Sequence, residues 1–372
     1  MSAIAITTAP PASQPAIARH RSAFIDYLRC VAFLSVFVQH IFVDEFERLA
    51  HSPDVATARA FTWLDQLVRI DGAPGIFGVV LFFMISGYCI TNAARRESAG
   101  QFAVRRVLRI YPLLVIALVL EFVLMRAGWV EAALPTWREF AGAATLTGDF
   151  FGVAPRLAGV DWTLRLEFVF YVTVGLGLAV AGNRPAWRNA ISTRACIVVA
   201  LLAIAALPAF PPGMWTRGYV NLFAPFLVVG AAFAAFERGE FTRRGVATAV
   251  AACLAVAAFT QHTIRPDYSR FQVYYLVAVA LFAFAWHARG RFGARHGVYR
   301  LALLTYATYL FHGFVVRALE RGLARLFPAG QARVLDAMGL NDVLAIVLFF
   351  VAMAALVACV EQPLVRWSKR LT

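Results

Sequence analysis

Long apolar stretches dominate this sequence and constrain its fold more than any other feature. A membrane-spanning helix needs roughly 20 predominantly apolar residues, and hydrophobic residues make up 61% of this chain while charged residues make up 15%. A soluble domain of ordinary composition carries more charge. We therefore predict an all-α, polytopic membrane bundle of about ten spans, near residues 24–43, 74–94, 110–126, 162–182, 195–211, 218–236, 245–261, 272–288, 300–320 and 343–365.

The basic residues between these spans predict how the bundle lies in the membrane. Positive charge is retained on the cytoplasmic side. With the N-terminus inside, 20 Arg and Lys residues fall on that side and 12 on the other. Both termini are therefore predicted to be cytoplasmic. Of the 35 basic residues only Lys369 is a lysine, which suggests a GC-rich bacterial gene and hence the plasma (bacterial inner) membrane.

Charge and cysteine usage limit the classes of function. The net charge is +14, but the basic residues are scattered between apolar segments, so they favour a topological role and no nucleic-acid partner is expected. All five cysteines lie inside apolar segments, where they behave as small hydrophobes, and no disulfide or metal site is predicted. Residues 1–21 are predicted to be a disordered cytoplasmic tail, followed by one transmembrane domain over 22–370.

The first span carries three polar side chains on one helix face. Arg29 and His40 are eleven residues apart, which at about 100° per residue returns to nearly the same face about 16 Å further along the axis. Asp26 lies within about 40° of that stripe. Charged groups inside a membrane are costly and indicate function by default. The stripe is therefore predicted to face a polar cavity.

Three arginines stand at the inner mouth of the third span. Arg105 and Arg106 lie four and three residues before Arg109, so the three guanidinium groups can converge. Guanidinium groups bind phosphates in a bidentate geometry, and Tyr111 follows in the same motif. The alternative is that these arginines only enforce topology.

The fourth span begins with two pairs of polar residues. Asp161 and Arg165 are one helical turn apart and are predicted to pair, while Glu167 and Tyr171 form a second couple that points elsewhere. A carboxylate as deep as Glu167 needs a partner, which an imidazole or guanidinium on the first helix would supply. A purely structural ion pair is the alternative.

The last two spans contribute a histidine and a proline. His312 shares one face of the ninth span with Thr305 and Tyr309. It is either a hydrogen-bonded packing residue or a catalytic one, and we rank it below His40. In the tenth span, Pro363 is expected to kink or break the helix near the inner surface.

Six motifs occur in a fixed order along the chain. They are Arg29 followed by ten residues and His40, Phe-Phe-Met-Ile-Ser-Gly-Tyr ending at Tyr88, Arg-Arg-Val-Leu-Arg-Ile-Tyr-Pro ending at Pro112, Trp-Thr-Leu-Arg-Leu-Glu ending at Glu167, Tyr-Ala-Thr-Tyr-Leu-Phe-His ending at His312, and Glu-Gln-Pro-Leu beginning at Glu361. Together they resemble the acyltransferase 3 family of integral membrane O-acyltransferases, over residues 22–370. The family usually shows Ser-Val-Glu after its Trp-Ser-Leu, so Arg165 is a departure.

The resemblance implies transfer of an acyl group, commonly acetyl, from cytoplasmic acyl-CoA to a hydroxyl of a sugar, glycan or related envelope or secreted molecule. We assign His40 as the general base that accepts the alcohol proton, with Glu167 or Asp26 orienting its ring. His312 is a further catalytic candidate. Direct transfer and a two-step route through an acyl-imidazole on His40 both remain open.

The resemblance also implies a donor site made of basic residues, with no metal. Arg29 would stabilise the thioester oxyanion or hold the CoA pyrophosphate. The nucleotide phosphates of acyl-CoA would be bound by Arg105, Arg106 and Arg109, with Tyr111 beside them.

The rival hypothesis is a polytopic transporter or flippase with an intramembrane proton relay. The relay would use Asp26, Arg29, His40, Glu167 and His312. Such a protein is expected to contain an internal repeat, and residues 1–185 and 186–372 show no convincing similarity to each other. A scaffold without catalysis would be expected to lack the arginine cluster and the buried histidines.

Overall fold

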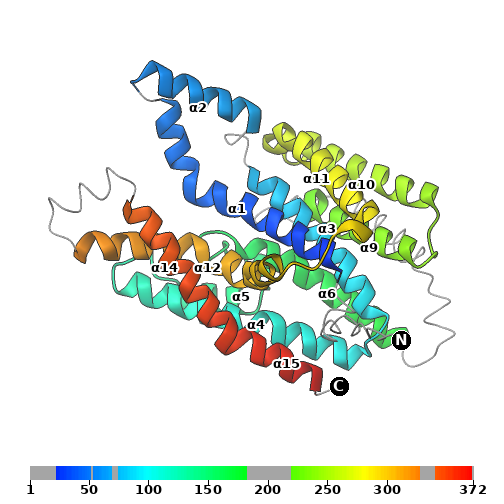
Figure 1. Cartoon of the computed structure of the whole chain (residues 1–372). Coiled ribbons are helices and arrows are strands. Elements are labelled where there is room, and N and C mark those ends of the chain that lie inside the picture. The colour runs from blue at the N-terminus through cyan, green and yellow to red at the C-terminus, as the bar shows by residue number, and fades with distance from the viewer. Residues whose placement is uncertain (1–21, 52, 69–73, 182–218, 327–339, 371–372) are drawn as a thin grey trace, which may run out of the picture.

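The computed structural model describes residues 22–51, 53–68, 74–181, 219–326 and 340–370 (Figure 1). All regular secondary structure in these ranges is helical. Nine helices of the described residues are long and apolar enough to cross a membrane, which confirms the predicted all-α membrane fold. The predicted tail 1–21 and the predicted span 195–211 lie outside the described residues.

The described chain is a succession of long helices joined by short ones. They are α1 (Ala23–Ala50), α2 (Val55–Val68), α3 (Pro74–Ala94), α4 (Ala99–Arg126), α5 (Trp137–Ala144), η2 (Gly148–Phe151), α6 (Asp161–Ala181), α9 (Tyr219–Glu237), α10 (Arg243–Thr263), η3 (Pro266–Phe271), α11 (Gln272–His287), η4 (Arg289–Arg291), α12 (His296–Leu326), α14 (Leu340–Leu356), η5 (Val357–Glu361) and α15 (Gln362–Arg370).

Helix α3 packs against α1 on one side and against α9 on another. Helices α3 and α9 approach until their backbones touch: a Cβ atom at Gly87 would overlap the carbonyl oxygen of Leu227, and one at Gly230 would overlap that of Met84. Small residues permit this close approach in membrane bundles. Helix α9 is in turn the most enclosed of the candidate spans.

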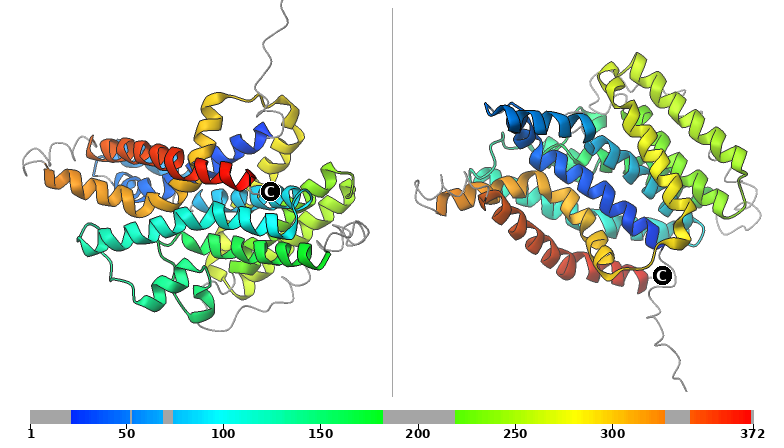
Figure 2. Two further views of the ribbon diagram at one scale, coloured as in Figure 1. Left: turned by 90° about the horizontal axis from the view of Figure 1, so that it is seen from below. Right: turned by 45° about the horizontal axis from the view of Figure 1, so that its top comes forward.

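Five helices form a closed ring on the other side of α3. Helix α1 packs against α12, α12 against α4, α4 against α6, α6 against α3, and α3 against α1. Helices α14 and α15 pack outside this ring, against α12 and α4 respectively (Figure 2). The polar residues of the first, third, fourth and ninth predicted spans therefore come together inside one ring.

The third span begins earlier than the apolar run predicts. Ser98 and Gln101 form a capping box, in which Oγ of Ser98 accepts from the Gln101 N–H at 3.2 Å and Oε1 of Gln101 accepts from the Ser98 N–H at 2.9 Å. This reciprocal cap starts the helix at Ala99. The arginine motif that was predicted at the mouth of the span consequently lies on the helix itself.

Residues 127–160, which lie between the third and fourth predicted spans, fold back against the bundle. They contain α5 and η2, and α5 packs against α4. The hydroxyl of Tyr111, in the middle of α4, donates to the carbonyl oxygen of Thr145 at 3.4 Å. The segment therefore contributes to the structure around the ring of helices.

The last helix passes Pro363 without breaking. The π-helical turn η5 ends two residues before the proline, and α15 continues the helix to Arg370. A π turn accommodates the missing proline N–H by shifting the hydrogen-bond pattern. Glu361 ends this turn as a buried residue.

Candidate active site

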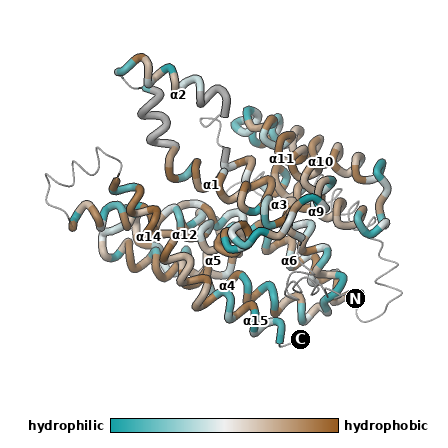
Figure 3. The backbone as a smooth tube through the Cα atoms, in the orientation of Figure 1, coloured by the Kyte–Doolittle hydropathy of each residue, from teal (hydrophilic) through white to brown (hydrophobic). Residues whose placement is uncertain are grey.

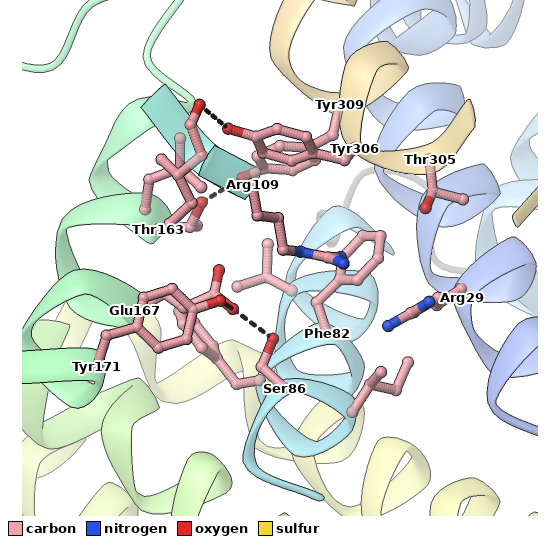
Figure 4. A pocket seen from close by; sticks show the side chains of 15 residues that line it. Arg29, Phe82, Ser86, Arg109, Thr163, Glu167, Tyr171, Thr305, Tyr306 and Tyr309 are labelled. Atoms are coloured by element: carbon pink, nitrogen blue, oxygen red, sulfur yellow. Dashed lines mark hydrogen bonds between the residues drawn. The ribbon is translucent and has the colours of Figure 1, made fainter. Parts of the chain in front are cut away.

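A cavity opens inside the ring of helices (Figure 4). All five helices of the ring contribute to its wall. The lining residues are Arg29, Val79, Phe82, Phe83, Ile85, Ser86, Arg109, Ile110, Thr163, Leu164, Glu167, Tyr171, Thr305, Tyr306 and Tyr309.

Two arginines from different helices point into this cavity. Arg29 comes from α1 and Arg109 from α4, and Figure 4 shows both guanidinium groups directed into the same space. The Nη2 atom of Arg29 lies 3.9 Å from Sγ of Cys89. Glu167 and Glu361 are the carboxylates that act on Arg109 electrostatically. Such a pair of guanidinium groups can stabilise an anion or a carbonyl oxygen that becomes negative.

Glu167 provides a carboxylate on another wall of the cavity. Its Oε1 atom accepts hydrogen bonds from the Ser86 hydroxyl at 2.8 Å and from the Tyr171 hydroxyl at 2.6 Å. The second contact confirms the pair predicted from helical spacing. The sequence predicts that an imidazole or guanidinium on the first helix accompanies this carboxylate. Arg29 of α1 lines the same cavity.

Two histidines from the first and ninth predicted spans meet beside the cavity. The Nδ1 atom of His40 lies 2.7 Å from Nε2 of His312, and the two rings stack with centroids 4.9 Å apart. His312 is only 1% exposed, whereas His40 is exposed. The pair therefore has a buried member and an accessible one.

The hydrogen bonds of His312 define where the protons of the pair lie. Its Nδ1 atom is 2.8 Å from the carbonyl oxygen of Tyr309 and 3.2 Å from that of Thr308. Because a carbonyl oxygen only accepts, Nδ1 carries the hydrogen, and neutral His312 offers Nε2 as an acceptor. His40 then donates from Nδ1, and its Nε2 keeps a lone pair. The partner of the His40 ring is thus His312, where the sequence suggested Asp26 or Glu167.

Tyr309 connects the histidine pair to the cavity. Its side chain lines the cavity, and its hydroxyl lies 2.8 Å from Oγ1 of Thr163 and 3.3 Å from the carbonyl oxygen of Val160. Its own carbonyl oxygen accepts from His312, as described above. His312 therefore lies one helical turn beyond a residue of the cavity wall, and His40 contacts it from α1.

The sequence of this chain matches a known protein family. An acyltransferase-domain family model matches residues 22–361. The chain belongs to the acyltransferase 3 family. The matched range contains all five helices of the ring and both histidines.

Two proteins are similar in sequence to this chain. The chain is 30% identical over 248 residues to nodulation protein 10 of Rhizobium leguminosarum bv. viciae, an alignment that covers 60% of each chain and so less than two thirds of that relative. It is 27% identical over 307 residues to an O-acetyl transferase of Shigella phage Sf6, covering 75% of this chain and 83% of the relative. No solved structure matches the chain.

The arginine motif of this acyltransferase 3 protein divides between two places. Nη1 of Arg105 lies 2.8 Å from Oε1 of Glu97, and Nη2 of Arg106 lies 3.5 Å from Oε2 of the same carboxylate. Arg109, one turn further along α4, reaches the cavity. The predicted convergence of three guanidinium groups is therefore seen for two of them, around Glu97.

Two other candidate residues lie away from the cavity lining. Asp26 is buried near the start of α1, fourteen residues before His40, which corresponds to about 21 Å along a helix. The Tyr111 hydroxyl bonds to Thr145 instead of lining the cavity. One helix cannot bring Asp26 and His40 into contact.

The cavity also contains residues that we did not single out from the sequence. Ser86 binds Glu167, and the Tyr306 hydroxyl donates to the carbonyl oxygen of Ile110 at 2.9 Å, which ties α12 to α4. Glu361 acts on Arg109 from the π turn. All three residues lie inside motifs quoted from the sequence. An acid or a hydroxyl within an otherwise apolar motif could therefore have marked them as site residues. Among the described residues, no group of three or more His, Cys, Asp or Glu could hold a metal ion.

Proposed function

We propose that this acyltransferase 3 protein transfers an acyl group, commonly acetyl, from acyl-CoA to a hydroxyl of a sugar or glycan. The observation that carries the proposal is the His40–His312 pair, held beside a cavity that contains two guanidinium groups. An alcohol is a poor nucleophile at neutral pH and needs a base. A thioester needs its developing oxyanion stabilised. Both kinds of group are present within the same ring of helices.

His40 is the general base of this proposal, and Nε2 is its reacting atom. The acceptor hydroxyl gives its proton to Nε2 while its oxygen attacks the thioester carbon, and the carbon–sulfur bond then breaks to release CoA. His312 keeps the Nδ1 hydrogen of His40 in place through the 2.7 Å contact. The two-step route uses the same atom: Nε2 attacks the thioester and releases CoA as a thiolate, and the acceptor hydroxyl then takes the acyl group while its proton passes to the freed Nε2.

Binding of the acyl-CoA donor is assigned to the arginines. We assign Arg29 and Arg109, which both line the cavity, to stabilising the thioester oxyanion or to holding the phosphates of acyl-CoA. Arg105 and Arg106 lie closer to the start of α4, where the nucleotide end of acyl-CoA would approach, and Glu97 keeps their side chains together.

The proposed orientation follows from the donor. Acyl-CoA is a cytoplasmic metabolite in the proposed reaction, and loop charges favour cytoplasmic termini in the bacterial inner membrane. The start of α1 and the start of α4 would then face the donor, and His40, further along α1, would lie nearer the opposite face. The O-acetyl transferase of Shigella phage Sf6 supports an acetyl group and an oxygen acceptor by its name.

The experiment is transfer of labelled acetyl from acetyl-CoA by the purified full chain in detergent, with a panel of glycan acceptors. His40→Ala is expected to lower kcat by about 10²- to 10⁴-fold, the contribution of a general base. His262→Ala is the matched control, because His262 is an exposed histidine at the end of α10. Absence of acyl-CoA binding by the wild type would contradict the proposal and favour the transporter hypothesis.

A further inference from the structure

Arg165 holds the segment that precedes α6. Its Nη1 atom donates to Asp149 at 2.8 Å and to the carbonyl oxygen of Val153 at 2.8 Å. Its Nη2 atom donates to Asp161 at 2.9 Å and to the carbonyl oxygen of Ala154 at 3.1 Å. Arg165 is 2% exposed. One buried guanidinium thus fixes two backbone positions of residues 153–160, here called the wall segment.

A second set of contacts fixes the wall segment from α4. Glu121 accepts from the Leu157 N–H at 2.9 Å and lies 3.5 Å from the Arg156 side chain. Asp161 also accepts from the Arg156 N–H at 2.7 Å. Hydrogen bonds to charged groups are stronger than those between neutral groups. The wall segment is therefore held by buried charges from both α4 and α6, although it has no regular secondary structure.

The tip of the wall segment has an unusual backbone and touches the helix that carries His312. Leu157, Ala158 and Gly159 have φ angles of 56°, 54° and 85°, a region that residues with a Cβ adopt only where their surroundings impose it. A Cβ atom at Gly313 would lie 2.5 Å from Cβ of Ala158. Ala158 therefore packs directly on Gly313, the residue that follows His312 in α12.

The position of this tip favours contact with the acceptor substrate over contact with the acyl-CoA donor. Arg105 and Arg106 lie near the start of α4, whereas the wall segment is bonded to Glu121 near the end of the same helix. The exposed residues of the wall segment are all small: Ala154, Ala158 and Gly159. The wall segment therefore presents only small groups next to the helix that carries His312.

We propose that the wall segment is one side of the acceptor site, that Ala158 sets how closely the acceptor hydroxyl approaches the histidine pair, and that Arg165 is the positioning residue that holds this wall. The inference rests on the proposed acyl transfer. It explains why an arginine occupies a position at which the resemblance leads one to expect another residue.

The test exploits the contact between Ala158 and Gly313. Gly313→Ala places a methyl group against Cβ of Ala158 and moves the tip, whereas in the double variant with Ala158→Gly the nearest remaining atom of residue 158 is 3.9 Å away. Gly313→Ala is expected to raise the KM for the acceptor by about tenfold, the effect of one methyl group in a binding pocket. The KM for acetyl-CoA is expected to stay unchanged, and Ala158→Gly is expected to restore the acceptor KM.

The matched control is Gly177→Ala, because a Cβ at Gly177 meets no atom within 4 Å. Arg165→Lys tests the positioning role: it keeps the charge but cannot make all four contacts, and the acceptor KM should rise more than kcat falls. Equal changes in the donor and acceptor KM, or no restoration by Ala158→Gly, would overturn the inference. Failure of the wild type to transfer acetyl at all would instead overturn the proposed function.

Discussion

The two sides of helix α3 are built in opposite ways. On the α9 side, Gly87 and Gly230 bring backbone against backbone. On the side of the ring, Arg29, Arg109 and Glu167 surround a cavity. Close packing allows few alternative arrangements, and charges inside a membrane are costly unless the protein holds them in place. The difference indicates that α3 and α9 form a rigid frame for the chemistry within the ring.

The largest expected effect on stability is at Arg165, on the charged side. Arg165→Met leaves Asp149 and Asp161 buried without their cation. Removing one member of a buried ion pair costs about 3–5 kcal/mol. The free energy of unfolding, measured by denaturant titration in detergent, is expected to fall by that amount. A loss below about 1 kcal/mol, typical of exposed pairs, would show that the charged side does not depend on this contact.

Next in size is the effect of Arg109→Gln, which tests the cavity without removing a packed group. Hydrogen bonds to charged groups contribute about 1.5–3 kcal/mol, so kcat/KM for acetyl-CoA should fall by roughly 10- to 150-fold. Thermal stability should fall as well, because Glu167 and Glu361 lose a neighbouring cation. Unchanged kinetics together with a lower melting temperature would make Arg109 a structural residue.

The close-packed side is tested by Gly230→Ala. The new methyl group meets the backbone of α3 at Met84, which cannot move aside as a flexible side chain could. Overpacking typically costs about 1–3 kcal/mol, and the unfolding free energy is the measurement. Gly175→Ala is the control, since its Cβ would lie 3.8 Å from Phe102, an ordinary contact. Equal behaviour of the two variants would remove the distinction between the sides of α3.

The smallest effect is expected at the capping box of α5. The Thr136 N–H and hydroxyl bond to the Glu139 carboxylate and lower the pKa of Glu139 below its usual value. A lowered pKa gives stability that is present above the pKa of the unfolded state and lost as the pH falls through that of the folded state. Glu139→Gln should lower the unfolding free energy at pH 7 by no more than about 0.5 kcal/mol. The difference in unfolding free energy between wild type and variant should disappear in acid. If it persisted at low pH, the ionised Glu139 carboxylate would not be its cause.

Local features of the molecule could be predicted from sequence, and non-local ones could not. The span positions follow from apolarity, and the pairs Asp161–Arg165 and Glu167–Tyr171 follow from helical spacing; both contacts are present. The start of α4 was missed because its first turns are too polar to count as an apolar span.

The histidine pair shows why the site itself could only be predicted in part. His40 and His312 are 272 residues apart, and helical periodicity gives the face of each helix but not which helices meet or at what height. The wall segment was equally hidden, since its conformation depends on charges from α4 and α6. Sequence therefore identified reactive residue types, while tertiary packing decided their partners.

The most direct test of the account compares two substitutions at His312. In His312→Gln the amide oxygen can still accept the Nδ1 hydrogen of His40, so kcat for acetyl transfer should stay within about threefold of wild type, because the bond is preserved. In His312→Leu that hydrogen loses its partner, and kcat should fall by roughly 10- to 100-fold, matching a lost buried hydrogen bond of about 1–3 kcal/mol. If both variants were equally inactive, or both fully active, His312 would not act by orienting His40.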